Sequence, residues 1–193
     1  MGIATKIRET TFQELQLDAG VLIASDRFTP TTTEIDAGEI LCATTGGITV
    51  SCVPTYSDFG ADIDNCPNNV KELKHLDGWD CKISTTALSL SMDMLRWSLG
   101  AADIETASGT QKYVPRRNVN KTTDFQDIWW VGDLGYNGIA CVKLINGLST
   151  GGFSLKTAKN NKGQLSLELT GHVSINDQDT MPMEFYLVGG SGA

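Results

Sequence analysis

Apolar and polar residues alternate strictly along residues 164–170, where every second side chain is leucine. Successive side chains of a β-strand point to opposite faces, so this pattern predicts a strand with one packed face and one solvated face. After Gly171, the apolar residues Val173 and Ile175 continue the same face. We therefore expect one strand of about twelve residues, which is longer than the usual five or six.

The rest of the chain also favours strands. A second alternating stretch covers residues 15–23, a strand is expected over 79–85, and shorter candidates lie at 128–131, 139–145, 153–157 and 184–188. Turn residues separate these segments: Asn137-Gly138 suits a tight hairpin, Asn146-Gly147 and Gly151-Gly152 break the chain, and 160–163 form a further turn. The second half is predicted to form consecutive antiparallel hairpins.

One helix is expected over residues 87–99. Its apolar residues recur at spacings of three and four: Leu88, Met92, Leu95 and Leu99. Thr86 can cap the start of this helix, and Gly100 suits its end. The pattern predicts a helix that packs one apolar stripe on a sheet.

Two segments are predicted to be loops. Residues 27–38 are rich in threonine, and residues 54–77 lack sustained periodicity. The second segment carries four polar residues of interest: Asp58, Asp62, Asp64 and Asn68. A loop longer than about 15 residues is uncommon in a compact domain and is usually functional or disordered. We expect this loop to fold against a neighbouring subunit.

Length and charge disfavour some classes of function, including tight binding to nucleic acids. The 193 residues fit a single domain, and the net charge of −8 disfavours tight binding to phosphates. Basic residues are scattered, with Arg116-Arg117 as the one adjacent arginine pair. No window has the roughly 18 consecutive apolar residues of a membrane-spanning helix, and no secretory signal opens the chain, so we expect synthesis in the cytoplasm and no membrane contact.

Motifs for catalysis or metal binding are weak. The chain has only two histidines, His75 and His172, which we interpret as surface or interface residues, with His172 inside the long strand. Calcium-loop spacing fails when it is counted from Asp62, because Pro67 and Leu73 occupy positions that require glycine and glutamate. We expect no enzymatic activity and no cofactor.

The five cysteines lie at positions 42, 52, 66, 81 and 141, at wide spacings and without a C-x-x-C pair. This pattern favours reduced, partly buried thiols. A zinc site remains an alternative, although its spacing matches no known finger or ribbon. Its ligands would be Cys66, His75 and Cys81 with Cys42 or Cys52.

Two adjacent tryptophans, Trp129 and Trp130, fall within a predicted strand. Neighbouring strand residues point to opposite faces, so the two rings cannot form one stacking platform. We expect one indole in the core and the other at a subunit interface, where buried aromatic residues often anchor contacts. Stacking on a sugar or a base is the alternative interpretation.

Several phrases of the sequence together resemble a known family. In the second half these are Asp127-Ile-Trp-Trp-Val-Gly-Asp-Leu, Ile139-Ala-Cys-Val-Lys-Leu-Ile-Asn-Gly-Leu-Ser-Thr-Gly-Gly, the alternating strand, and Met181-Pro-Met-Glu-Phe-Tyr. In the first half they are Leu17-Asp-Ala-Gly-Val-Leu, Ala43-Thr-Thr-Gly-Gly-Ile, Ile63-Asp, Asn69-Val-Lys-Glu-Leu and the strand and helix over 79–100. These phrases resemble the tail tube proteins, or major tail proteins, of long-tailed phages of Gram-positive bacteria.

The resemblance implies a mainly β fold: a β-sandwich or barrel with one flanking α-helix. It implies hexameric rings that stack into a tube, with strands of all subunits joined in one shared β-barrel. The whole chain, 1–193, would be a single tail tube domain. Residues 1–14 would form an N-terminal arm, 54–77 the loop that contacts the next ring, and 189–193 a flexible tail.

The resemblance also implies a location in the virion tail and a conduit through which genomic DNA passes without specific binding. The solvated strand face would then line the lumen, with Ser166, Glu168 and Thr170 on it and Lys143 as a further candidate. Partners would be other copies of the chain and the tape measure, tail-tip and tail-terminator proteins.

Two alternatives stay open beside the phage tail tube. The same subunit chemistry would serve a phage-tail-like bacteriocin or a contractile injection system. A carbohydrate-binding β-sandwich of the tail tip would instead use Trp129 or Trp130 to stack on sugars.

Overall fold

The computed structural model describes residues 7–8, 10–31, 35–135 and 138–189. The strands are β1 (Gln16–Ala24), β2 (Thr44–Asp58), β3 (Lys74–Ala87), β4 (Ala102–Ala107), β5 (Thr110–Pro115), β6 (Gln126–Leu134), β7 (Gly138–Ser149), β8 (Ser154–Lys156), β9 (Gln164–Thr170) and β10 (Met183–Val188). The α-helix of the described residues is α1 (Met92–Leu99), and short 3₁₀ turns are η2 (Thr11–Glu14), η3 (Ser25–Arg27), η4 (Ala37–Glu39), η5 (Lys71–Leu73) and η6 (Thr122–Asp124).

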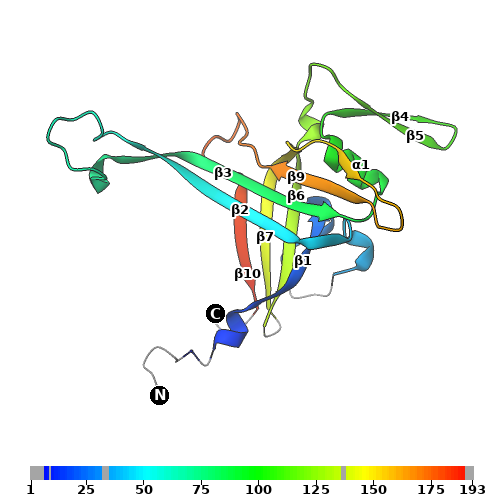
Figure 1. Cartoon of the computed structure of the whole chain (residues 1–193), viewed down its shortest axis with the longest axis horizontal. Coiled ribbons are helices and arrows are strands. Elements are labelled where there is room, and N and C mark those ends of the chain that lie inside the picture. Colours follow the sequence, from blue (N-terminus) through cyan, green and yellow to red (C-terminus); the bar gives the residue numbers. More distant parts are fainter. Residues whose placement is uncertain (1–6, 9, 32–34, 136–137, 190–193) are drawn as a thin grey trace.

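The fold is mainly β, as the sequence predicts. Eight strands form one antiparallel sheet in the order β1-β6-β7-β9-β3-β2, with β10 beside β7 and β8 beside β9. Strand β7 pairs with β6 and β10 over most of its length and then passes to β9 at Leu148 and Ser149. The sheet thus folds over itself into two layers, one of β1, β6, β7 and β10 and the other of β2, β3, β8 and β9 (Figure 1).

The main hydrophobic core lies between the two layers. It combines the leucines of β9 with residues of β1, β3, β6, β7, β10 and α1; its large side chains include Leu22, Ile83, Met94, Trp97, Ile128, Leu144, Leu165, Leu167, Leu169 and Met183. The predicted alternation along β9 is confirmed, because its three leucines are at most 1% exposed. A smaller cluster around Trp129 lies on the outer side of the first layer.

The expected continuation of this strand to Ile175 is wrong. Strand β9 ends at Thr170, and Ile175 is 82% exposed. At Gly171 the chain passes so close to its neighbours that a Cβ atom would lie 2.8 Å from Leu144 and 2.9 Å from Pro182. The backbone therefore turns away here, and His172 lies outside the strand that was expected to hold it.

The helix is shorter than predicted and differs in its buried face. Strand β3 continues to Ala87, and the helix begins only after Ser91, whose hydroxyl accepts a hydrogen bond from the Met94 backbone N–H at 3.1 Å. Its buried side chains are Met94, Trp97 and Ser98 instead of the predicted stripe. Its end at Gly100 is confirmed, where the backbone has a positive φ of 63°.

The predicted turns had mixed outcomes. The chain does not break at Asn146-Gly147, because β7 runs through both residues with a bulge opposite β6. The turn after β8 is confirmed, with Asn160 at φ 57°. Asn137 lies outside the described residues, and so does the predicted tail apart from Gly189. The β4–β5 hairpin was missed, although its Ser108-Gly109 turn, with positive φ at both residues, has a recognisable sequence signal.

Truncating a leucine of β9 tests the assignment of its two faces. We expect Leu167→Ala to lower the free energy of unfolding by about 2–5 kcal/mol, because the fully buried side chain leaves a cavity in the core. The adjacent Ser166 points to the opposite, solvated face, so Ser166→Ala should change it by less than about 0.5 kcal/mol. Urea denaturation of both variants checks the prediction, and similar losses would contradict it.

Candidate functional site

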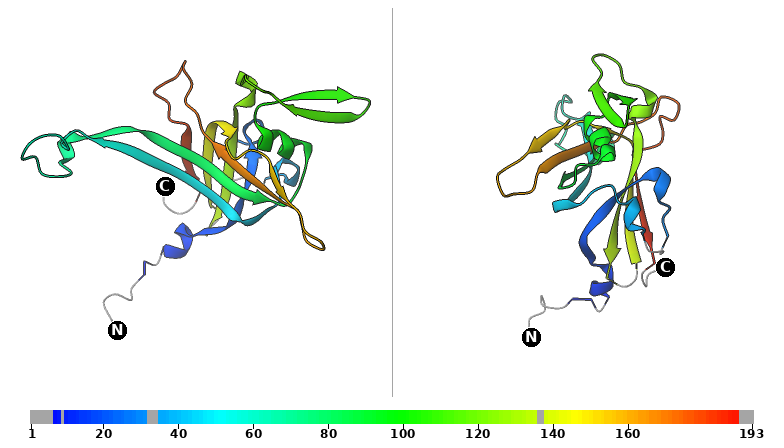
Figure 2. Two further views of the ribbon diagram at one scale, coloured as in Figure 1. Left: turned by 45° about the horizontal axis from the view of Figure 1, so that its top comes forward. Right: turned by 90° about the vertical axis from the view of Figure 1, so that its right-hand side faces the viewer.

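The most unusual feature of the molecule is a hairpin that projects from its body. Strands β2 and β3 pair over 15 and 14 residues, whereas β9 supports β3 only between Lys82 and Ala87. Beyond this support the hairpin continues as two strands alone and extends away from both layers (Figures 1 and 2). The expected loop over 54–77 is therefore wrong in its bounds: the strands reach Asp58 and restart at Lys74, and only residues 59–73 connect them.

One face of this projecting hairpin is apolar. Pro54 lies directly opposite Trp79, and Tyr56 lies opposite Leu76, so each pair shares a face. The alternation along β2 places this face on the side that is the core within the body, where Cys52 and its neighbours are covered. Outside the body the face is open: Tyr56 is 51%, Leu76 42% and Trp79 38% exposed. Exposed apolar side chains grouped on one face make this part of the hairpin a candidate contact surface.

The tip of the hairpin is a small folded unit. The Phe59 N–H donates to the Leu73 carbonyl at 3.0 Å, and the rings of Phe59 and His75 lie 5.7 Å apart. Gly60 is buried, and a Cβ atom there would lie 3.1 Å from both Cys66 Sγ and Leu73 Cδ1. The tip thus has its own packing and presents a defined shape.

Three of the four polar residues predicted for inter-ring contact lie in this tip, and Asp58 borders it. Asp62, Asp64 and Asn68 are exposed. Asp58 is half-buried at the end of β2, where its carboxylate accepts a hydrogen bond from the Gly60 N–H at 3.0 Å. Asp58 therefore shapes the turn, while the other three are free to meet a partner.

The solvated face of β9 carries three of the residues expected to line a lumen. Ser166, Glu168 and Thr170 lie on the side opposite the buried leucines, and they pair with Thr86, Ser84 and Lys82 of β3 respectively. The Thr170 hydroxyl lies 2.8 Å from that of Thr150. This surface is rich in hydroxyl groups and has one acid and one base.

Lys143 does not belong to that surface. Its neighbours Val142 and Leu144 face the main core, so Lys143 points to the outer side of the other layer. There its ammonium group pairs with Asp127 at 2.9 Å and lies 5.9 Å from the centre of the Trp129 ring. The expectation that Lys143 shares a face with Ser166 is wrong, because the two strands belong to different layers.

Trp129 and Trp130 point to opposite sides of β6, as the strand pattern predicts. Trp129 is 4% exposed, and its ring packs edge-on against Phe28 at 5.4 Å and in a tilted arrangement against Tyr186 at 5.3 Å. Trp130 is half-buried, and its indole N–H donates to the Ala19 carbonyl at 3.2 Å. Both rings are thus used within the chain, and neither provides an open platform for sugar stacking.

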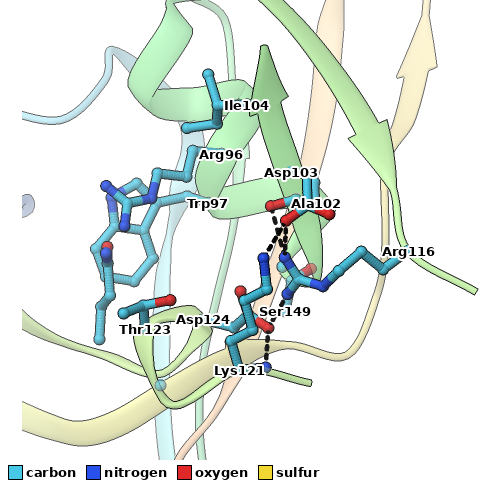
Figure 3. Close-up of a pocket in the computed structure, with 13 residues that line it drawn as sticks. Arg96, Trp97, Ala102, Asp103, Ile104, Arg116, Lys121, Thr123, Asp124 and Ser149 are labelled. Atoms are coloured by element: carbon cyan, nitrogen blue, oxygen red, sulfur yellow. Dashed lines mark hydrogen bonds and ion pairs between the residues drawn. The ribbon is translucent and has the colours of Figure 1, made fainter. Parts of the chain in front are cut away.

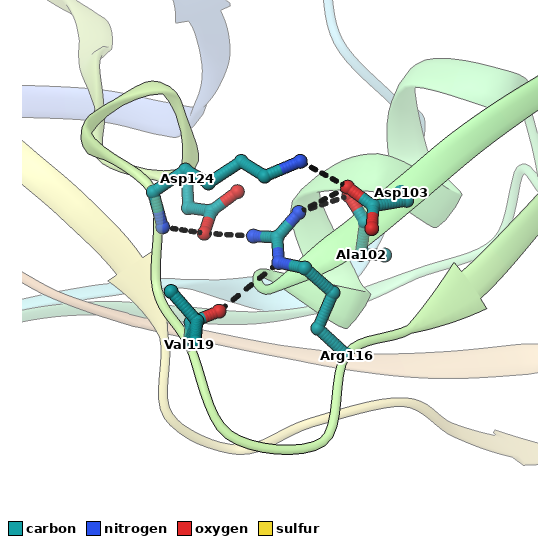
Figure 4. Close-up of polar contacts among 6 residues, drawn as sticks. Ala102, Asp103, Arg116, Val119 and Asp124 are labelled. Carbon is teal, nitrogen blue, oxygen red and sulfur yellow. Dashed lines mark hydrogen bonds and ion pairs between the residues drawn. The ribbon is translucent and has the colours of Figure 1, made fainter.

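A charged cluster joins the β4–β5 hairpin to the segment before β6. Arg116 is at its centre and lines a cavity of about 210 Å³ (Figure 3). The guanidinium donates to the Ala102 and Val119 carbonyls at 3.1 and 3.0 Å, to Asp103 at 2.7 Å, and to Asp124 (Figure 4). The acids neutralise the arginine, so the cluster fastens two segments of the chain together.

The contribution of the Asp124–Arg116 interaction to stability should depend on pH. Burial raises the pKa of its carboxyl, but hydrogen bonds from Arg116 and the Lys121 backbone N–H outweigh burial and hold the pKa below its ordinary value. A carboxyl with a lowered folded-state pKa stabilises the fold above its unfolded pKa of about 3.9, and this contribution disappears as the pH falls through the folded value. We expect Asp124→Asn to lower the melting temperature at pH 7 and to match the parent chain in acid. The exposed Asp64→Asn is the control, and a difference that persists unchanged in acid would contradict the prediction.

The cysteines do not form the zinc site considered from the sequence. Cys66 and His75 lie at the hairpin tip, whereas Cys81 lies at its base. Within the described ranges, no three His, Cys, Asp or Glu side chains are arranged to hold a metal ion. Burial raises the pKa of the Cys42 and Cys141 thiols to about 11, which makes them poor nucleophiles.

The described part of the chain contains no helix of the length and apolar character needed to cross a membrane. No family model matches the sequence, and no curated protein matches it either.

Proposed function

We propose that this chain is a structural subunit that polymerises into the tail tube of a bacteriophage, the conduit for genomic DNA. The observation that carries this proposal is the projecting β2–β3 hairpin, whose core-side face has no covering layer outside the body. The resemblance of the sequence to tail tube proteins supplies the biological setting. The same subunit in a phage-tail-like bacteriocin or injection system would use the same contacts.

The hairpin needs a partner for physical reasons. An isolated two-stranded hairpin is at best marginally stable in water. Its strands extend about 20 Å past Cys52, at roughly 3.3 Å per residue, with Tyr56, Leu76 and Trp79 exposed along that length. A second copy that covers this face would bury the apolar side chains and support the strands.

Strand β10 offers a second surface for assembly. It pairs with β7 alone, so its other edge is unpaired within the described chain. Phe185 and Leu187 are 64% and 77% exposed, on the side where Met183 enters the core. A free edge with exposed apolar residues favours pairing with another chain, and closing a ring of subunits removes such edges.

In the proposed tube, the polar face of β9 lines the channel. Ser166, Glu168 and Thr170 present hydroxyl and carboxylate groups, which do not hold phosphate tightly. DNA would then slide past without specific binding. Six subunits per ring, the tape measure, tail-tip and tail-terminator partners, and the virion location come from the family resemblance and belong to the proposal.

Electron microscopy over a concentration series tests the proposal. Purified chain should form hollow tubes of uniform diameter above a critical concentration, and analytical ultracentrifugation should show loss of monomer over the same range. A chain that stays monomeric at every concentration, with and without tail-tip proteins as initiators, would overturn it.

A further inference from the structure

Two cysteines lie in contact across the projecting hairpin. Cys52 of β2 and Cys81 of β3 are direct partners in the antiparallel register, and their Sγ atoms lie 2.9 Å apart. Direct cross-strand partners have Cα atoms about 4.5–5.5 Å apart, within the range of about 4.4–6.8 Å that a disulfide requires. Both residues are free thiols in the structure. Little backbone movement would be needed to join them.

The pair occupies the base of the hairpin. The Cys81 carbonyl accepts a hydrogen bond from the Gly171 N–H at 2.9 Å, next to the last residue of β3 that β9 supports. From this point outward, β2 and β3 have only each other. A covalent bond here would fix the register of the two strands where the support from the body ends.

We propose that Cys52 and Cys81 form an oxidation site, at which a small disulfide such as oxidised glutathione converts the two thiols into a disulfide staple. The Cys52 thiolate attacks the small disulfide, forms a mixed disulfide and releases one glutathione thiolate. The Cys81 thiolate then attacks the Cys52 sulfur and releases the second glutathione. The two protons lost by the cysteines are taken up by the two leaving thiolates, so two thiols are oxidised as one disulfide is reduced.

The surroundings of the pair set the order of these steps. Cys52 is half-buried, whereas Cys81 is fully buried, so an external oxidant reaches Cys52 first. Burial and the hydrogen bond with Cys52 raise the pKa of the Cys81 thiol to about 12. Since the thiolate is the reacting form, ring closure should be slow at neutral pH and faster in mild alkali.

The staple goes beyond the proposed polymerisation, because it forms within one chain whether or not tubes assemble. A reducing cytoplasm keeps such thiols reduced, and an oxidising environment allows the disulfide to persist. For a particle that is assembled inside a cell and then released, the bond would form after assembly. It would stiffen the hairpin in the released particle.

The test uses the full-length chain with oxidised glutathione. After oxidation and denaturation, the five thiols should fall by two, leaving three that react with an alkylating reagent. Complete trypsin digestion, which includes cleavage after Lys71 and Lys74, should then leave fragment 28–71, which carries Cys52, joined to fragment 75–82, which carries Cys81, until a reductant is added; mass spectrometry detects the joined pair. Cleavage at either residue separates Cys52 from Cys81, so the joined fragments report a bond across the hairpin.

Single substitutions identify the bond. Cys52→Ser and Cys81→Ser should both abolish the joined fragments, and the half-buried Cys52 makes the first variant the less disruptive to folding. Cys66→Ser, at the hairpin tip, is the matched control and should still lose two thiols. Five reactive thiols after prolonged oxidation, a glutathione adduct without a cross-link, or joined fragments in Cys52→Ser would each overturn the proposal.

Discussion

A chain that lacks the hairpin tip should fold normally and fail to form tubes. The tip is removed by replacing residues 59–73 with Asn-Gly, so that a two-residue turn links Asp58 to Lys74. These two residues are cross-strand partners, and Asn-Gly forms the two-residue turn whose twist matches antiparallel strands. The main core contains no residue of the tip, so the melting temperature should change little.

The expected effect on assembly is large. The tip presents Phe59 and Ile63, 63% and 53% exposed, at the point of the molecule farthest from its body (Figure 1). If this tip contacts the next ring, its loss should raise the critical concentration for polymerisation at least about 100-fold. This factor corresponds to a loss of roughly 2.7 kcal/mol in the free energy of subunit association. Light scattering and electron microscopy measure the change.

A charge variant separates the shape of the tip from its acidity. Asp62→Asn with Asp64→Asn keeps the fold of the tip, because both side chains are exposed. This control should still form tubes, with a changed dependence on salt. If the chain without the tip formed tubes in normal yield, the proposed inter-ring role of the hairpin would be contradicted.

The parts of the fold that sequence could predict are those where one face of an element is buried. Along β9, Leu165, Leu167 and Leu169 enter the core and the residues between them meet water, so burial alone imposes the alternation. The end of the helix was also predictable, since Gly100 has a positive φ that favours glycine. Local chemistry and burial agree at these positions.

The projecting hairpin could not be predicted as a pair of strands for the opposite reason. Outside the body the apolar face is carried by only two residues of each strand, and a bulge between Trp79 and Leu76 interrupts the alternation along β3. Pro54 and Gly78 resemble loop residues when read alone, although both lie within strands. The prediction that the helix starts at residue 87 was wrong because Ala87 pairs with Thr44 and Leu165. These tertiary contacts override local helix propensity.

The candidate site residues also divide into those that a single strand pattern predicts and those that depend on tertiary structure. The sequence correctly placed Ser166, Glu168 and Thr170 on one solvated face, because they belong to one strand. It misplaced Lys143, whose face depends on which layer β7 joins. The contact between Cys52 and Cys81 depends on the register of two long strands, which residue spacing cannot reveal.

Charges on the free edge of β10 should prevent assembly while leaving the monomer intact. The variant is Phe185→Lys with Leu187→Lys. Both side chains are mostly exposed, so the free energy of unfolding should change by no more than about 0.5 kcal/mol per substitution. Lysine on an edge strand blocks pairing with another strand, because the approaching chain would have to bury the charge.

The matched control places the same two substitutions on exposed apolar residues away from any sheet edge. Val173 and Ile175 are 48% and 82% exposed and lie outside the named strands, so Val173→Lys with Ile175→Lys adds the same charge without touching β10.

Sedimentation should show the β10 variant as monomer at concentrations where the parent chain and the control polymerise. If the β10 variant forms tubes as readily as the control, its edge is not a subunit contact. If both variants stay monomeric, net charge and not the β10 edge governs assembly. Only a loss of polymerisation that is confined to the β10 variant supports a ring that is closed through this strand.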